Sequence, residues 1–537
     1  MADTPEPGIG GNWAIVDTPT LILPVIAVGH TANATTEPQE TLASGAGGQM
    51  AVLQKLVKSS GIYALSSVAV PLVSLVLAPF LTHHLSPTDY GVFAIISTAI
   101  SLGVGITQLG LSSAFFRAYG YDYSSERDRR DVIATVTVLL CLVSIPTVIV
   151  VTLTAPGLAK LLFGRSSLGN YISLAGGIIL LQNLTVPAMA WLRAESRSLL
   201  FSLLSISNLL VTLLATIFLV GVQHWGILGA IIANGSGYAC MVICTVPITV
   251  LRTGIKLRAD IARNLLTFGL PLVLNFVSYW VLQLSDRYLL SLFASLAETA
   301  RYTVVYTLGS AMSVVIISPF TLAWPTALFT IAQRKDAVQV FKLIFRWFSM
   351  FLLFAAFGFS LGATFILDWL FPETYHSAAL VIPVVAESIA FYGAYFLFMA
   401  GANIKRKTWL AAVFTTIAAV VNLALNLVLI PLSGAMGAAA STLIAYIVLA
   451  LAAYIVNQRL YPIPFEIGRV TVALFIGVVL YVGSSFLAQS RGTYMAWGIY
   501  CGAFALYAGC LALLGKLPAR SYSGEKKKCY VLKDIIS

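Results

Sequence analysis

A stripe of polar side chains runs along one apolar stretch near the middle of the chain, residues 265–293. The stretch is long enough to cross a bilayer, which takes about 20 apolar residues. Its polar members, spaced mostly three or four residues apart, are Asn275, Tyr279, Gln283, Asp286 and Arg287. Residues at that spacing share one face of a helix. Because lipid does not tolerate such a face, we predict that the stripe faces a bundle interior or a wet cavity and binds substrate.

Arg287 has two interpretations. It lies 22 residues past Leu265, about 33 Å along a helix at 1.5 Å per residue, which is close to the thickness of the hydrocarbon core. It could therefore reach water at the outer interface, with Asp286 as its partner. Alternatively it lies in a cavity, where its guanidinium matches the geometry of a phosphate. Asn275 and Tyr279 lie deeper in the stretch, and we expect them to face the interior.

Three more residues are candidates for function. Glu387 lies about ten residues from either end of the apolar stretch 377–401, where a carboxylate is costly unless it is paired, protonated or wet. It either couples protons to transport or binds sugar hydroxyls, or it is a neutral acid hydrogen-bonded between helices. Arg117 either gathers an anion from the cytoplasmic side or only anchors its loop. Asn183, before Pro187, is expected to line a kinked helix, although such a kink can serve packing alone.

Motifs for catalysis or metal binding are absent from the sequence. The nearest match to a phosphate-binding loop, residues 509–516, has five residues between its glycines instead of four, and Leu517 replaces the required Ser or Thr. The six cysteines have no metal-ligand spacing. We therefore expect no catalytic residues, no cofactor and no metal.

The polar residues must be positioned by membrane helices. Of the 537 residues, 59% are apolar and only 10% are charged, against about 25% charged in soluble domains, and the mean hydropathy is +0.90. The sequence predicts an all-α polytopic membrane protein with about 14 transmembrane helices. They are expected at about 61–82, 91–116, 132–155, 171–192, 199–221, 227–250, 265–293, 302–330, 343–370, 377–401, 409–431, 437–457, 470–488 and 495–515.

The basic residues predict the orientation of these spans. If the N-terminus is cytoplasmic, 27 of the 32 Lys and Arg residues lie on the cytoplasmic side, four lie outside, and Arg287 lies in or near the membrane. Such a bias is typical of the positive-inside rule, so both termini are expected in the cytoplasm. The net charge of +11 is spread over short loops, so no nucleic-acid partner is expected.

The chain also repeats itself. Trp225–Ala230 (WGILGA) recurs 208 residues later as Ser433–Ala438 (SGAMGA), and each opens a predicted span with G-x-x-G-A. Six spans per half would give two parallel six-helix repeats around a central cavity; the alternative is a chance recurrence of small residues at helix starts. The expected domains are a disordered cytoplasmic tail (1–54), the two repeats (55–252 and 253–460), two additional helices (461–516) and a basic cytoplasmic tail (517–537).

Three stretches carry a family resemblance. They are Leu85–Gly120, with its Y-G-x-F segment; Ser285–Gly309, with its D-R pair before an aromatic span; and Gly401–Thr442, with the pair Asn422/Asn426 and I-P-x-x-G-x-x-G-A-A. Together they resemble the polysaccharide transporter (Wzx-type flippase) family of the multidrug/oligosaccharidyl-lipid/polysaccharide exporter superfamily, over about residues 55–460. The chain differs from that pattern in its long polar N-terminus and in Arg301 before a tyrosine.

The resemblance implies a function. Members flip undecaprenyl-pyrophosphate-linked oligosaccharide repeat units from the inner to the outer leaflet of a bacterial inner membrane, for lipopolysaccharide or exopolysaccharide synthesis. The partners would be the lipid-linked oligosaccharide and the bilayer, with a polysaccharide polymerase and a chain-length regulator as candidates. The alternatives are a lipid II flippase or a cation-coupled drug exporter of the same superfamily, a non-transporting partner of a polysaccharide synthase, and a membrane glycosyltransferase.

Overall fold

The computed structural model describes residues 76–489, 491 and 493–516. These residues are largely helical, with no strand among them. Twelve of their helical segments are long and apolar enough to cross a membrane, which confirms the predicted all-α polytopic membrane fold. The predicted tails 1–54 and 517–537, and most of the first predicted span, lie outside the described residues.

Long helices follow one another with short connections, as the alternation of apolar runs and short polar loops predicts. The helices are α2 (Pro87–Thr107), α3 (Leu111–Arg117), α4 (Glu126–Phe163), α5 (Gly169–Ala194), α6 (Ser198–Thr216), α7 (Gly226–Thr253), α8 (Ala259–Phe293), α9 (Leu296–Met312), α10 (Ser318–Ala332), α11 (Ala337–Leu370), α12 (Val381–Phe398), α13 (Ala400–Ile404), α14 (Trp409–Leu460), α15 (Ile467–Ala488) and α16 (Thr493–Lys516).

Helix α14 contains two predicted spans joined by a turn. Its 52 residues would be far too long for one crossing, and its backbone leaves helical geometry at Ser433 and Gly434. The Asn422 amide donates to the Thr442 hydroxyl at 3.4 Å, although 20 residues of straight helix would separate them by about 30 Å. The segment is therefore a helical hairpin that crosses twice, as predicted. With residues 76–84, which are helical, the described part agrees with about 14 spans.

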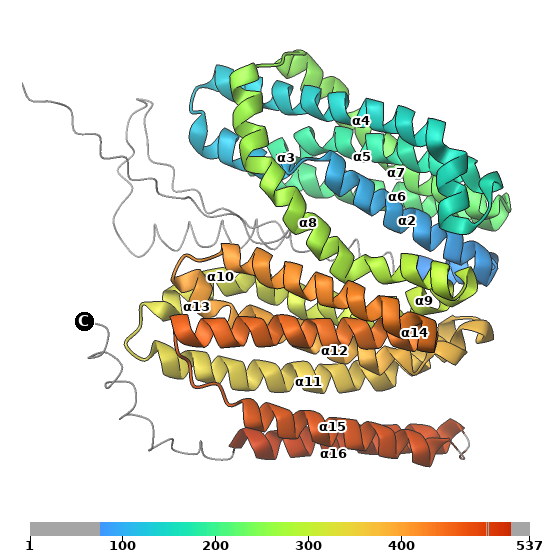
Figure 1. The fold of residues 1–537 in the computed structure, drawn as a ribbon, viewed down its shortest axis with the longest axis vertical. Helices are drawn as coiled ribbons and strands as arrows, with labels where there is room; N and C mark the ends of the chain where they lie inside the picture. Colours follow the sequence, from blue (N-terminus) through green and yellow to red (C-terminus); the bar gives the residue numbers. More distant parts are fainter. Residues whose placement is uncertain (1–75, 490, 492, 517–537) are drawn as a thin grey trace, which may run out of the picture.

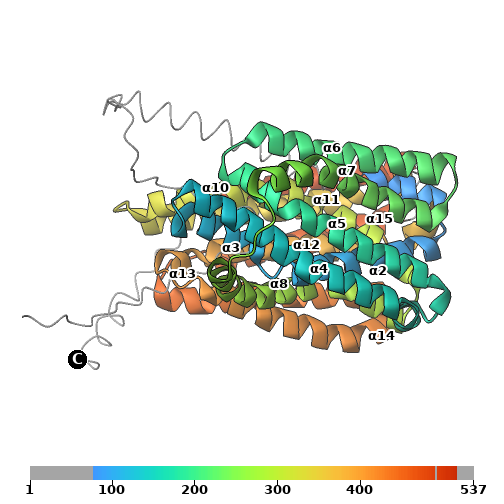
Figure 2. The same ribbon diagram turned by 90° about the horizontal axis from the view of Figure 1, so that it is seen from above.

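The helices form two groups with α8 between them (Figure 1). Helices α2 to α7 pack together in one group, and α9 to α14 form the second. Helix α8 crosses diagonally from the first group to the second and contacts α2, α9 and α14. Seen from above, the short helices α3, α10 and α13 gather at one end (Figure 2). The loops at this end carry most of the basic residues, so we name it the basic end.

The G-x-x-G-A stretches of both halves begin with a glycine of positive φ. Gly226 has φ of +56° and Gly434 has φ of +54°, a left-handed conformation that glycine adopts without strain. A Cβ at Gly437 would collide with the backbone of Leu429, and one at Gly229 would be in tight contact with the backbone of Leu219. This shared geometry is expected of a repeat. That the two six-helix halves with their proposed bounds are parallel repeats stays a prediction.

Helices α15 and α16 form a hairpin against the outer side of α11 (Figure 1). Glu466, just before α15, accepts hydrogen bonds from Arg346 of α11 at 2.7 and 2.6 Å and lies 3.1 Å from Lys342 Nζ. Burial alone would raise the pKa of this carboxyl, but the hydrogen bonds from Arg346 and Lys342 outweigh it and hold the pKa below its ordinary value. The hairpin is thus attached to α11 by ion pairs at the basic end.

Candidate functional site

The polar stripe lies on α8 and meets α9 because a tight turn joins the two helices. Helix α8 ends at Phe293, and Ser295 caps α9 by accepting a hydrogen bond from the Glu298 backbone N–H at 3.1 Å. Such an N-cap satisfies a free helix donor and lets the chain reverse at once. The reversal places the second and third turns of α9 beside the last third of α8.

The Asp286 carboxylate is buried and fully engaged. Its exposed fraction is 2%, and that of Arg287 is 7%. Its Oδ1 accepts a hydrogen bond from the Arg287 backbone N–H at 2.8 Å and lies 3.3 Å from Arg287 Nη1. The Tyr302 hydroxyl of α9 donates to Oδ2. A buried carboxylate needs this full set of partners, because removing a charge from water is costly.

Arg287 lies in the protein interior. Its Nη1 donates to the backbone oxygen of Gln283 at 3.0 Å, and its guanidinium lies 4.6 Å from the centre of the Tyr306 ring. The Tyr306 hydroxyl donates to Gln283 Oε1 at 3.0 Å. Of the two placements that the sequence leaves open, the structure therefore favours the interior over the water interface.

Tyrosines from α8 and from two further helices extend this cluster. The Tyr392 ring of α12 lies 5.1 Å from the Tyr446 ring of α14, and Tyr279 of α8 packs against the core that contains both. One turn earlier on α8, the Asn275 side-chain oxygen is buried without a hydrogen-bond partner among the described residues. The stripe thus joins a charged pair, flat aromatic faces and one unused acceptor, all aimed into protein.

Residues 80–380 match the model of a family described as "polysaccharide biosynthesis protein", over more than half of the chain. The chain belongs to this family. The match contains α8 and α9, and therefore the Asp286–Arg287 pair, whereas Glu387 and the α15–α16 hairpin lie beyond it. Among curated protein sequences, none matches the chain.

Solved structures of transporters have a similar fold. The lipid II flippase MurJ, in an inward closed conformation, has a TM-score of 0.66 at 15% identity, covering 85% of this chain and 99% of its own. A variant of the MATE transporter VcmN of Vibrio cholerae has a TM-score of 0.54 at 16% identity, covering 76% and 97%. An inward-facing multidrug resistance MATE transporter of the MOP superfamily has 0.55 at 14%, covering 74% and 97%. These likenesses support the predicted exporter fold, and the family match confirms the predicted polysaccharide transporter family.

Two of the predicted site residues, Arg117 and Asn183, lie outside the cluster that surrounds Asp286 and Arg287. Arg117, at the end of α3, stacks 4.8 Å from the Phe268 ring and lies 3.6 Å from Asp122. It is partly exposed at the basic end, which suits either of its predicted roles. Asn183 is wholly buried, and its amide donates to Thr107 at 2.7 Å and to Ser144 at 2.8 Å. It joins α2, α4 and α5, so in this conformation its contacts are those of packing.

Glu387 faces away from the charged pair. It precedes Tyr392 by five residues, which places it about 140° further round α12 at 3.6 residues per turn. Its Oε2 is buried without a hydrogen-bond partner among the described residues, and Tyr507 of α16 lies nearby. The structure does not bring Glu387 together with Asp286 and Arg287, so a coupling role for it stays a prediction.

Sequence reasoning did not single out Tyr446. It lies in an apolar segment with no polar stripe of its own, and only the α14 hairpin brings it to Tyr392. Tyr302 and Tyr306 carry a local signal, because α9 repeats an aromatic residue at i and i+4 directly after the D-R pair. That spacing puts both rings on one face, which is the face that meets α8.

Proposed function

We propose that this protein flips undecaprenyl-pyrophosphate-linked oligosaccharide repeat units from the inner to the outer leaflet of a bacterial inner membrane. The observation that carries the proposal is the buried Asp286–Arg287 pair on the helix that crosses between two helix groups, in a chain of the polysaccharide biosynthesis family. Transport would proceed by alternating access. The basic end would face the cytoplasm, with both termini on that side.

The chemistry of such a substrate explains why a charged pair would be kept inside the membrane. A pyrophosphate and hydrated sugars cannot enter hydrocarbon unaided, because each polar group that loses water costs several kcal/mol. A guanidinium binds phosphate through two parallel hydrogen bonds. Arg287 would supply that contact, while the aromatic faces around it would pack against sugar rings and the lipid tail stayed in the bilayer.

The contact between Asp286 and Arg287 suggests how the site stays electrically neutral between transport cycles. Asp286 occupies Arg287 when no phosphate is present, so the interior holds no net charge. Incoming phosphate would replace Asp286 on the guanidinium, and Tyr302 would keep the released carboxylate hydrogen-bonded. The exchange needs α8 and α9 to shift relative to each other, which is the kind of motion that alternating access supplies.

One alternative of another class has little room in this structure. A membrane glycosyltransferase would need a large outer catalytic loop, whereas the connections between the described α-helices have at most ten residues, in 371–380. Lipid II and cationic drugs remain alternative substrates within the superfamily, since likeness of fold does not decide substrate.

Flipping can be measured in proteoliposomes that contain a lipid-linked oligosaccharide. Wild-type protein should make the sugar accessible to an added glycosidase or lectin, and Arg287→Ala should slow that step at least tenfold if one phosphate contact of about 1.5–3 kcal/mol is lost. Arg334→Ala, at an exposed ion pair of the basic end, is the matched control. A wild-type rate for folded Arg287→Ala would exclude the phosphate role.

The same assay distinguishes the alternatives. If only lipid II moves, the substrate assignment is wrong but the flippase assignment holds. If a cationic dye moves on an ion gradient and no pyrophosphate-linked sugar does, the protein is a drug exporter. Glu387→Gln should weaken transport at unchanged protein level if Glu387 couples an ion; full activity would remove it from the mechanism.

A further inference from the structure

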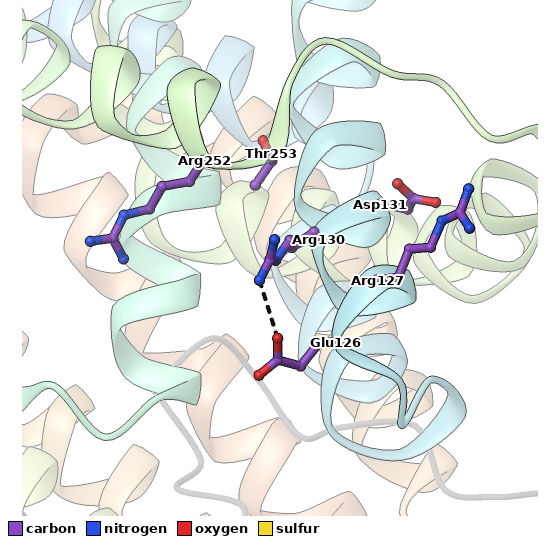
Figure 3. Close-up of a pocket in the computed structure, with 6 residues that line it drawn as sticks. All are labelled: Glu126, Arg127, Arg130, Asp131, Arg252 and Thr253. Atoms are coloured by element: carbon purple, nitrogen blue, oxygen red, sulfur yellow. Dashed lines mark hydrogen bonds and ion pairs between the residues drawn. The ribbon is translucent and has the colours of Figure 1, made fainter.

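A cavity at the basic end of the first helix group is lined largely by charged side chains (Figure 3). Its volume is about 480 Å³. Four of the lining residues come from the start of α4 and two from the end of α7. They are Glu126, Arg127, Arg130, Asp131, Arg252 and Thr253.

The two acids of the cavity are already neutralised. Glu126 pairs with Arg130 at 3.1 Å. Asp131 lies 2.8 Å from Lys256 and 3.3 Å from Arg258, both in the α7–α8 connection. Among the described residues, neither Arg127 nor Arg252 has a carboxylate within ion-pair distance. Arg127 points away from Arg252 in Figure 3 and interacts electrostatically with Asp128. Arg252 therefore brings to the cavity a guanidinium group without an ion-pair partner among the described residues, and this group favours an anion.

An aromatic side chain brings a second arginine next to Arg252. The Trp191 ring of α5 lies 5.5 Å from the Arg252 guanidinium and 5.0 Å from that of Arg197, just before α6. Cations over a Trp face are attracted by the ring, so Trp191 holds two positive charges close together. Arg197 also has no carboxylate partner in the part of the chain that the structure describes. Trp side chains are typical of the level of lipid headgroups.

Apolar side chains next to the arginines face outward. Leu251 is 85% exposed and Ile255 is 81% exposed, and Leu199 beside Arg197 is largely exposed as well. A site for a soluble anion would be rimmed by polar groups in contact with water. Arginines next to exposed apolar side chains at the end of membrane helices fit a ligand with a phosphate and acyl chains.

We propose that Arg197 and Arg252 bind the phosphate of an anionic phospholipid of the inner leaflet, whose acyl chains cover Leu251 and Ile255. Basic pockets between helices on the cytoplasmic side attract such headgroups. The inference uses the cytoplasmic orientation of the basic end, and it does not depend on which substrate is transported.

Native mass spectrometry of the purified full-length protein tests the site. The protein is titrated with phosphatidylglycerol and with phosphatidylcholine of the same chain length. Wild type should bind phosphatidylglycerol preferentially, and R197Q/R252Q should bind it about thirtyfold more weakly, as expected for two basic side chains at an anionic headgroup. K405Q/K407Q removes the same charge from exposed residues of the second group and should bind like wild type.

Three results would overturn the proposal. Equal losses in R197Q/R252Q and K405Q/K407Q would mean that overall charge, not this site, attracts the lipid. Equal wild-type binding of phosphatidylcholine would exclude phosphate-charge selectivity. Displacement of the lipid by glycerol phosphate at the same concentration would mean that the site takes a soluble phosphate. Thermal unfolding of each variant checks that a loss of binding is not a loss of fold.

Discussion

Removing both charges of the Asp286–Arg287 pair should destabilise the protein by less than the sum of the two single removals. Asp286→Asn leaves Arg287 buried with only the Gln283 carbonyl and the Tyr306 face as partners, so we expect a cost of about 3 kcal/mol. Arg287→Gln leaves Asp286 with the Tyr302 hydroxyl and a backbone N–H, and should cost about 2 kcal/mol. The double variant buries two neutral amides and should cost about 2 kcal/mol. The two single costs add up to about 5 kcal/mol, so the coupling energy between the two residues is about 3 kcal/mol.

The assay is reversible unfolding of the detergent-solubilised protein in increasing SDS, followed by tryptophan fluorescence, for all four proteins of the cycle. Arg334 and Asp336 provide the matched control, since they pair at 2.8 Å with exposed fractions of 58% and 48%. Their cycle should give a coupling energy below about 1 kcal/mol, because water screens an exposed pair. If the two cycles give the same coupling, Asp286 and Arg287 are in contact with water and the assignment of a dry interior pair is wrong.

Three further predictions concern the scaffold. Gly110→Ala should lower the free energy of unfolding by about 2 kcal/mol or more, because the φ of Gly110 is +68° and a Cβ would collide with the backbone of Gly269. Gly120 has open space around it, so Gly120→Ala should leave stability nearly unchanged. Thermal unfolding of both variants measures the difference. Asn183→Ala should cost about 1–3 kcal/mol by leaving two buried hydroxyl groups without their donor, measured by SDS unfolding. The pKa of the Glu466 carboxyl is lowered in the folded protein, so its contribution to stability is fully present above its ordinary pKa and is lost as the pH falls through the folded value. Unfolding measured between pH 7 and 3 should show a smaller acid-side loss in Glu466→Gln than in wild type. Part of the loss should remain, because other carboxyls, such as that of Asp336, also have a lowered pKa.

The positions of the spans could be predicted from apolar runs, but their ends could not. Helix α4 begins at Glu126, not at 132, because Ser125 accepts a hydrogen bond from the Asp128 backbone N–H at 3.1 Å. An S-x-x-D pattern before an apolar run is visible in the sequence as a helix start. Hydropathy alone misses it, since the first turn is charged and projects beyond the apolar run.

The direction in which each polar residue faces was only partly predictable. In a soluble helix an apolar face marks the core, whereas in a membrane helix both the lipid side and the protein side are apolar. The α8 stripe is long enough to define a face by itself. A single polar residue such as Asn183 or Glu387 does not define a helix face. Only the packed structure shows that Asn183 joins helices within the first group and that Glu387 faces α16. For the same reason, the sequence did not predict that Tyr446 faces the protein interior.

The geometry of Arg287 bears directly on how a flippase of this family would work. In the part of the chain that the structure describes, the hydrogen bond, ion pair and ring contact of the guanidinium come from α8 itself or from α9. They are made by the Gln283 carbonyl and Asp286 of α8 and by the Tyr306 ring of α9. Its counter-ion is in turn held by Tyr302 of α9. On the proposed function, a phosphate would reach Arg287 when the α8–α9 hairpin opens. Because α8 is the helix that crosses between the two groups, movement of one group against the other would open the hairpin and expose the positive charge in the same step. On this proposal the binding site is formed by the transport motion, and the charge meets the membrane interior only with phosphate or Asp286 as its partner.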